Sequence, residues 1–132
     1  MRGSVLLLLS LAGPARAQTH PTVAEHIVLG DTAHAAIAPA QALQHYRAAL
    51  AVDSTNYAAL WKAGRELVDI AKQVQGKDDS SKHLRDSLYT AARAYGEAAV
   101  RVNPSGADGH FTVGQALGRL SRTKGEIGRA HV

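Results

Sequence analysis

The stretch LWKAG, residues 60–64, ends in a glycine that recurs at fixed distances along the chain. Its counterparts are HIVLG, residues 26–30, and HFTVG, residues 110–114, so the three glycines lie 34 and 50 residues apart. The spacing of 50 also relates the segment that begins at Ala49 to the segment that begins at Ala99. Two matches at one spacing indicate an internal repeat, and a repeat decides the architecture before any local pattern does.

The shorter spacing, 34 residues, is the period of tetratricopeptide repeats, in which each unit is a pair of helices. Residues 42–53 (ALQHYRAALAVD) resemble the second helix of such a unit, and residues 92–104 resemble the same helix again. The longer spacing contains 16 extra residues, which fall in a polar, turn-prone region between residues 64 and 92. We expect these extra residues to lengthen two adjacent helices and their connection.

Helical periodicity and capping residues predict five helices and no strand. The expected ranges are 23–36, 39–51, 57–73, 81–102 and 107–122. The expected caps are Thr22 for the first helix, Thr55 or Asn56 for the third and Ser105 for the fifth. The predicted fold class is therefore all-α, a tetratricopeptide-like solenoid with two complete helical hairpins followed by the first helix of a third.

The first 17 residues have the layout of a secretory signal peptide. Arg2 gives a basic start, residues 5–11 form an apolar run, and Ala17 precedes the expected cleavage site. The run is too short for a membrane span, which takes about 20 apolar residues. We therefore expect residues 1–17 to direct export and the mature protein to have no stable membrane insertion.

The last seven residues, 126–132 (EIGRAHV), resemble the in-frame translation of a common sequencing adapter. On that interpretation the repeat domain occupies residues 18–125 and the natural chain continues beyond Gly125. The whole chain carries a formal charge of +4, but the repeat domain alone carries 12 basic and 10 acidic residues. No basic stripe is interleaved with aromatic residues, so we expect no nucleic-acid partner.

The third predicted helix, residues 57–73, has two neighbouring stripes of different character. The apolar stripe that should pack against the partner helix consists of Leu60, Ala63, Gly64, Leu67 and Ala71. The stripe beside it contains Trp61, Arg65 and Val68, and the matching stripe of the fifth helix contains Phe111, Gln115 and Arg119.

The first helices of stacked hairpins line the concave side of a superhelix. We therefore expect the six residues of the second stripe to line a groove that holds a protein or peptide segment, with Trp61 and Phe111 as apolar anchors. Burial of both aromatic side chains in the core is an alternative, because large apolar residues are usually buried. A second alternative is an architectural protein that self-associates through Val113, Leu117 and Leu120 at its open end.

The composition gives little support to chemistry at a site. The chain has no cysteine, which excludes disulfides and cysteine-ligated zinc. Its seven histidines include no pair with HExxH spacing. The carboxylates of Asp31, Glu66 and Asp69 could face the groove or solvent, but their spacing places no pair in a shared pocket. We expect no metal, no cofactor and no enzymatic activity; a metal-binding or enzymatic accessory role is the weaker alternative.

Residues 59–69 (ALWKAGRELVD) and 109–120 (GHFTVGQALGRL) resemble the bacterial relatives of the regulator of microtubule dynamics family. These relatives are tetratricopeptide-like proteins with a similarly enlarged repeat, and the resemblance spans about residues 22–125. It implies a helical scaffold for protein contacts in a bacterium, which with the leader means a periplasmic or extracellular location. A microtubule role does not carry over to an exported chain.

Overall fold

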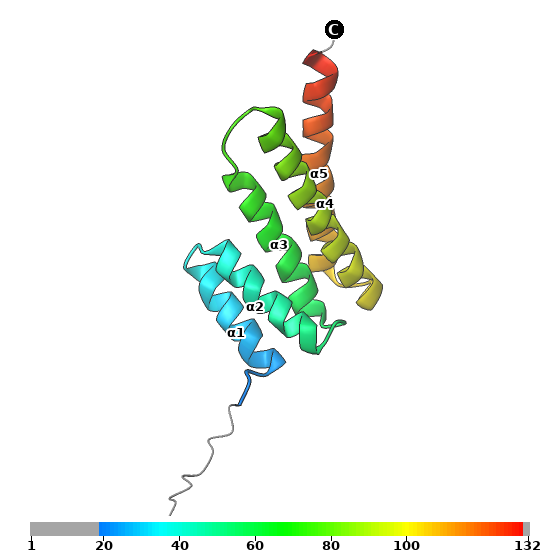
Figure 1. The fold of residues 1–132 in the computed structure, drawn as a ribbon. Coiled ribbons are helices and arrows are strands. Elements are labelled where there is room, and N and C mark those ends of the chain that lie inside the picture. The colour runs from blue at the N-terminus through cyan, green and yellow to red at the C-terminus, as the bar shows by residue number, and fades with distance from the viewer. Residues whose placement is uncertain (1–18, 131–132) are drawn as a thin grey trace, which may run out of the picture.

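The computed structural model of the chain describes the backbone of residues 19–130 and the side chains of residues 19–125. Within that range the chain forms five α-helices and no strand, which confirms the predicted all-α class (Figure 1). The helices are α1 (Val23–Ala35), α2 (Pro39–Val52), α3 (Tyr57–Gln73), α4 (Asp79–Val102) and α5 (Ala107–Ala130). The predicted signal peptide lies outside the described residues.

Side-chain caps set the starts of three helices. The Thr22 hydroxyl accepts the N–H of Glu25, and the Glu25 carboxylate accepts the N–H of Thr22, which completes a capping box at α1. Asn56 caps α3, and Asp78 caps α4, each by accepting a backbone N–H of the first turn. A cap of this kind contributes about 1 kcal/mol to stability, so the capping residue fixes where each of these helices begins.

Several helix boundaries differ from the predicted ones. Because Asp78 is the cap, α4 begins two residues earlier than expected. The residue before α5 is Gly106, so Ser105 does not occupy the capping position; its hydroxyl donates to Asn103 instead. The backbone of α5 continues to Ala130, eight residues beyond its predicted end. Helices α3 and α4 have 17 and 24 residues, whereas α1 and α2 have 13 and 14. These lengths agree with an insertion that lengthens both α3 and α4.

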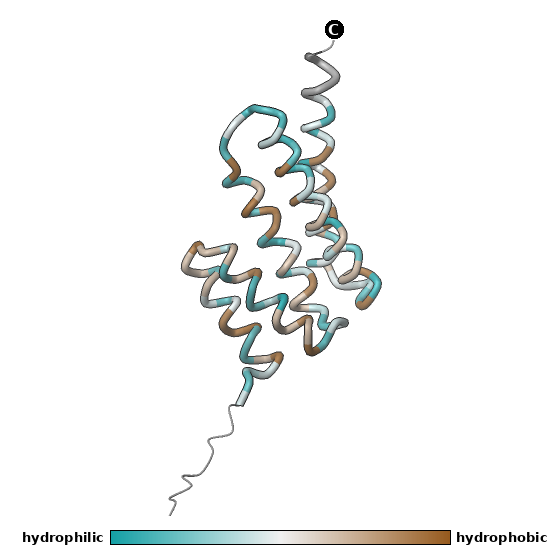
Figure 2. The backbone as a smooth tube through the Cα atoms, in the orientation of Figure 1, coloured by the Kyte–Doolittle hydropathy of each residue, from teal (hydrophilic) through white to brown (hydrophobic). Residues whose placement is uncertain are grey.

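The third helix, α3, is the centre of the arrangement and contacts all four other helices. Helix α2 packs against both α1 and α3, and α4 packs against both α3 and α5. Direct contacts also join α1 to α3 and α3 to α5. The C-terminal part of α5 extends past the α3–α4 connection (Figure 1), and that connection is hydrophilic (Figure 2).

The core consists mainly of small residues at repeated positions. Ala42, Tyr46 and Ala49 of α2 are completely buried, and so are Ala92 and Ala99 of α4, which follow Ala42 and Ala49 by 50 residues. The repeat read from the sequence therefore corresponds to equivalent buried positions. The predicted apolar stripe of α3 is buried as well, at Leu60, Ala63, Gly64, Leu67 and Ala71.

Glycine allows three helices to meet at one point of the core. A methyl group added to Gly64 of α3 would lie 2.6 Å from the Thr112 methyl carbon on α5 and 3.0 Å from the Ala92 carbonyl oxygen on α4. Both distances are shorter than van der Waals contact, so a side chain at residue 64 would push α4 or α5 away. At Gly114, by contrast, the same methyl group would meet no atom within 4 Å.

The turn between α1 and α2 contains an unusual residue. Ile37 has a φ of 57°, in the left-handed region that β-branched residues rarely occupy. The N–H of Ile37 donates to the His34 carbonyl and the N–H of Ala38 to the Ala33 carbonyl, the two hydrogen bonds of a Schellman motif. Glycine is the usual residue at this position, so the chain carries local backbone strain here.

Candidate functional site

The structure places the six predicted groove residues on two helices in contact, α3 and α5. Phe111 is 66% exposed, so it is not a core aromatic. Trp61, Arg65, Gln115 and Arg119 are each partly exposed.

Val68 has to be removed from the set of groove residues, because it is 1% exposed and belongs to the core cluster. The physical reason is that α3 contacts four helices, which makes its buried face wider than the apolar stripe alone.

Two cations lie near the indole ring of Trp61. The Nζ of Lys62 is 5.5 Å from the centroid of the indole ring, and the guanidinium carbon of Arg65 is 5.1 Å from it. Both distances are within the range of cation–π attraction. The backbone carbonyl of Trp61 also accepts a 3.4 Å hydrogen bond from the hydroxyl of the buried Thr112 on α5. The backbone of Trp61 is therefore tied to α5, the helix that carries Phe111, and the Trp61 side chain is half-buried.

A polar cluster links α1, α2 and α3. The carboxylate of Asp31 on α1 accepts hydrogen bonds from the Tyr46 hydroxyl at 2.6 Å and from Lys62 Nζ at 2.7 Å. Arg65 donates to the same hydroxyl at 3.4 Å. Tyr46 therefore contacts the groove residue Arg65 while its ring covers Gly30 of α1.

The environment of this cluster changes two pKa values in opposite directions. Burial, together with the hydrogen bond to the Asp31 carboxylate, raises the pKa of Tyr46 well above its ordinary value of 10. Partial burial opposes ionisation of Asp31, but the hydrogen bonds from Lys62 and Tyr46 and the nearby positive charge outweigh it and lower the pKa of Asp31. Both effects favour a neutral tyrosine beside a charged carboxylate.

A second polar cluster lies further along the contact between α1 and α3. Glu66 is fully buried, which corrects the expectation that this carboxylate faces the groove or solvent. Its Oε1 accepts a 2.9 Å hydrogen bond from Arg65 Nε, and His34 Nδ1 lies 2.9 and 3.1 Å from its two carboxylate oxygens. The carboxylate of Asp69, one turn along α3, pairs with Lys72 at 2.8 Å.

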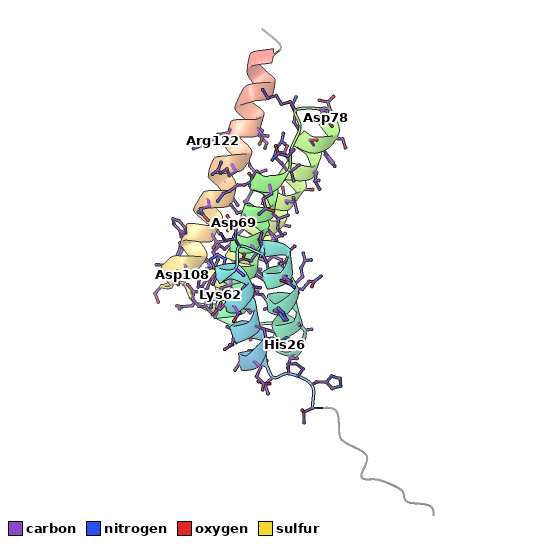
Figure 3. The ribbon with its side chains drawn as sticks, turned by 90° about the vertical axis from the view of Figure 1, so that its left-hand side faces the viewer. His26, Lys62, Asp69, Asp78, Asp108 and Arg122 are labelled. Atoms are coloured by element: carbon purple, nitrogen blue, oxygen red, sulfur yellow. The ribbon has the colours of Figure 1, made fainter. Side chains whose placement is uncertain are left out.

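One hollow is formed by the residues around this second cluster. It measures about 400 Å³, and His34, Ile37, Glu66, Asp69 and Lys72 contribute to its lining. One ligand atom each from His34, Glu66 and Asp69 can be chosen so that all three lie within 4.8 Å of one another. In Figure 3, Asp69 and Lys62 are both labelled near the centre of the molecule, between the ends marked by His26 and Asp78.

A larger hollow, about 750 Å³, lies at the start of α1 and is lined by residues 19–22, Ala24, Glu25, Val28 and Leu29. None of the predicted groove residues and none of the polar-cluster residues contribute to it. The hollow at the His34–Glu66 pair combines a cavity with ionisable side chains from two helices.

Sequence reasoning missed the link between Lys62 and Asp31, although the repeat contains a signal for it. Lys62 precedes Gly64 by two residues, and Asp31 follows Gly30 by one. Thr112, which precedes Gly114 by two, packs its methyl group beside Gly64. In α3 and α5, the residue two positions before the repeated glycine thus lies beside the glycine region of α1 and α3, respectively.

Comparison with known protein families, curated proteins and solved structures yields no match. The resemblance to relatives of the regulator of microtubule dynamics family therefore stays a prediction. Among the described residues, no helix is both long and apolar enough to cross a membrane.

Proposed function

We propose that the chain is a tetratricopeptide-like scaffold that holds a protein or peptide segment along the side formed by α1, α3 and α5. Its function is binding rather than catalysis, and the location is the cell envelope. Residues 1–17 supply the export signal in this proposal.

The order of helix contacts supports a solenoid. Each second helix, α2 or α4, packs between the first helix of its own pair and the first helix of the next pair. The first helices also contact one another, α1 with α3 and α3 with α5. This is the pattern expected when helical hairpins stack with a constant rotation, which leaves the first helices on the concave side.

The repeated glycines support the same arrangement. In the first two units the glycine of the first helix is covered by the second helix, Gly30 by Tyr46 and Gly64 by Ala92 and Tyr95. In the third unit Gly114 has no second helix to cover it among the described residues. Two covered glycines and one open glycine are what we expect from two complete hairpins followed by a first helix without a partner among the described residues.

The observation that carries the binding proposal is the 66% exposure of Phe111 on the helix next to the half-buried Trp61. Exposed aromatic side chains beside arginine are typical of binding hot spots. Arg119 lies two turns beyond Phe111 on α5 and forms no ion pair within the described residues. The preferred segment therefore has an apolar side chain for Phe111 and Trp61 and an acidic group for Arg119.

Peptide selection from a random phage-displayed library tests this proposal. We expect the selected peptides to lose at least tenfold in affinity for Phe111→Ala and to lose affinity, with a weaker salt dependence, for Arg119→Gln. Leu84→Ala is the control, because Leu84 is a 49% exposed apolar side chain on α4 and is not one of the proposed groove residues. Peptides that bind Phe111→Ala as well as the wild type but lose affinity for Leu84→Ala would place the binding surface elsewhere.

A second candidate function is self-association through α5. Leu117 is 42% exposed, and a methyl group added to Gly114 or Gly118 would meet no atom within 4 Å, so this face of α5 is open. Light scattering across a concentration series measures the oligomeric state. If self-association is the function, the wild type forms dimers and Leu117→Glu is monomeric; a wild-type monomer at all concentrations leaves peptide binding as the function.

A further inference from the structure

We propose that His34, Glu66 and Asp69 form a binding site for a divalent first-row transition-metal ion, with zinc as the ion to test. The site lies in the 400 Å³ hollow between α1 and α3 and does not depend on the scaffold function proposed above. No spacing in the sequence indicates it, because one ligand comes from α1 and the other two lie one turn apart on α3.

The chemistry of the donor set selects the type of ion. One imidazole with two carboxylates is a ligand set that zinc and its neighbours accept, whereas calcium and magnesium prefer oxygen ligands alone. Three protein ligands also leave a fourth position open, and the hollow provides space there for water or another donor.

The ligand atoms need only a small adjustment to bind zinc. Zinc–ligand bonds of about 2.1 Å place tetrahedral donor atoms about 3.4 Å apart. His34 Nδ1 and the Glu66 oxygens, at 2.9 and 3.1 Å, already lie close to that separation. The donor atoms of the whole set lie within 4.8 Å, so a movement of at most about 1.4 Å falls on Asp69, whose side chain is 34% exposed and can turn at the surface.

Glu66 has the surroundings of a metal ligand that is fixed before the ion arrives. Its side chain is completely buried, and Arg65 Nε holds Oε1 by a 2.9 Å hydrogen bond. Hydrogen bonds of this kind orient the carboxylate ligands of metal sites. Both carboxylate oxygens face His34, with Oε1 at 2.9 Å and Oε2 at 3.1 Å from Nδ1.

Lys72 provides a charge-based test of the proposal. Its ammonium group lies 2.8 Å from the Asp69 carboxylate, so a metal ion has to displace it. The lysine side chain is 39% exposed and can move into solvent. Removal of this positive charge should therefore tighten metal binding, whereas a purely structural ion pair predicts no such gain.

Isothermal titration of the full chain with zinc chloride, without a histidine tag and after treatment with a chelator, measures the affinity. We expect one ion per chain with a micromolar or lower dissociation constant, and a visible absorption band of four-coordinate cobalt when Co²⁺ is the probe. Zinc should also raise the melting temperature, because it binds only the folded arrangement of the two helices.

The variants separate this site from adventitious binding. His34→Ala and Asp69→Asn should each weaken zinc binding at least tenfold, Lys72→Gln should tighten it severalfold, and His83→Ala on α4 should leave it unchanged. The side chains of His34, Asp69 and Lys72 are partly exposed, so circular dichroism should show a wild-type fold in each of their variants. Three results overturn the proposal: no binding at 1 mM zinc, binding that survives the His34→Ala/Asp69→Asn double variant, or a loss of affinity in Lys72→Gln.

Discussion

Replacement of Gly64 by alanine tests the close helix packing at the centre of the fold, and Gly114→Ala is its matched control. Both glycines lie inside helices and hold the same position in the repeat. Alanine is better than glycine in a helix interior by about 1 kcal/mol, so both variants gain this amount. They differ only in the space around the new methyl group.

At residue 64 the methyl group would lie 2.6 Å from the Thr112 methyl carbon and 3.0 Å from the Ala92 carbonyl oxygen. Thr112 is 1% exposed and the oxygen belongs to the backbone of α4, so neither obstacle can move cheaply. Overpacking of a core typically costs about 1–3 kcal/mol, and two rigid obstacles place Gly64→Ala at the upper end. After the helix gain is subtracted, we expect a net loss of about 2 kcal/mol.

At residue 114 the methyl group meets no atom within 4 Å, so only the helix gain remains. We expect Gly114→Ala to be more stable than the wild type by about 0.5–1 kcal/mol. Urea denaturation followed by far-ultraviolet circular dichroism should therefore separate the midpoints of the two variants by about 1 M or more. A Gly64→Ala protein as stable as the wild type, or two variants with equal losses, would refute the packing described here.

Three further predictions concern single side chains. Phe111→Ala should lower the unfolding free energy by less than about 1 kcal/mol and Trp61→Ala by about 2 kcal/mol, because the Phe111 side chain is 66% exposed and that of Trp61 is half-buried. Urea denaturation measures both losses. Equal losses near about 4 kcal/mol would place Phe111 in a core. Ile37→Gly should raise the melting temperature by a few degrees, since glycine adopts the φ of 57° with little strain; a lower melting temperature would show that the isoleucine side chain stabilises the fold. The raised pKa of Tyr46 means that the folded protein resists loss of the tyrosine proton, so its contribution to stability is complete below pH 10 and is lost as the pH rises above that value. Tyr46→Phe should flatten this alkaline decline in denaturation experiments at several pH values; an unchanged slope would assign the decline to other groups.

The sequence predicted the helices well because their signals are local. Thr22 with Glu25 and Asn56 with the first turn of α3 are caps formed by residues three apart, and Pro39 begins α2 as predicted. The repeated glycines also indicated which helices pair, since the spacings of 34 and 50 residues are visible without coordinates.

The candidate sites were harder to predict because they depend on contacts between distant residues. Glu66 is polar and its neighbours in sequence include Arg65, so nothing local distinguishes a buried ion pair from an exposed one. Its burial requires α1 to bring His34 across 32 residues of sequence. Helical periodicity places Val68 on the groove stripe although it is buried, because periodicity gives the direction of a stripe but not the width of the buried face.

The central position of α3 has a consequence for how the protein opens. Its backbone amides are shielded by four neighbouring helices, whereas the last turns of α5 extend beyond the rest of the fold. Hydrogen exchange should therefore be slowest in α3 and fastest toward the end of α5, with α1 between them. Transient unfolding then proceeds inward from the two outer helices, and the last segment to lose its structure is the one that contains Gly64.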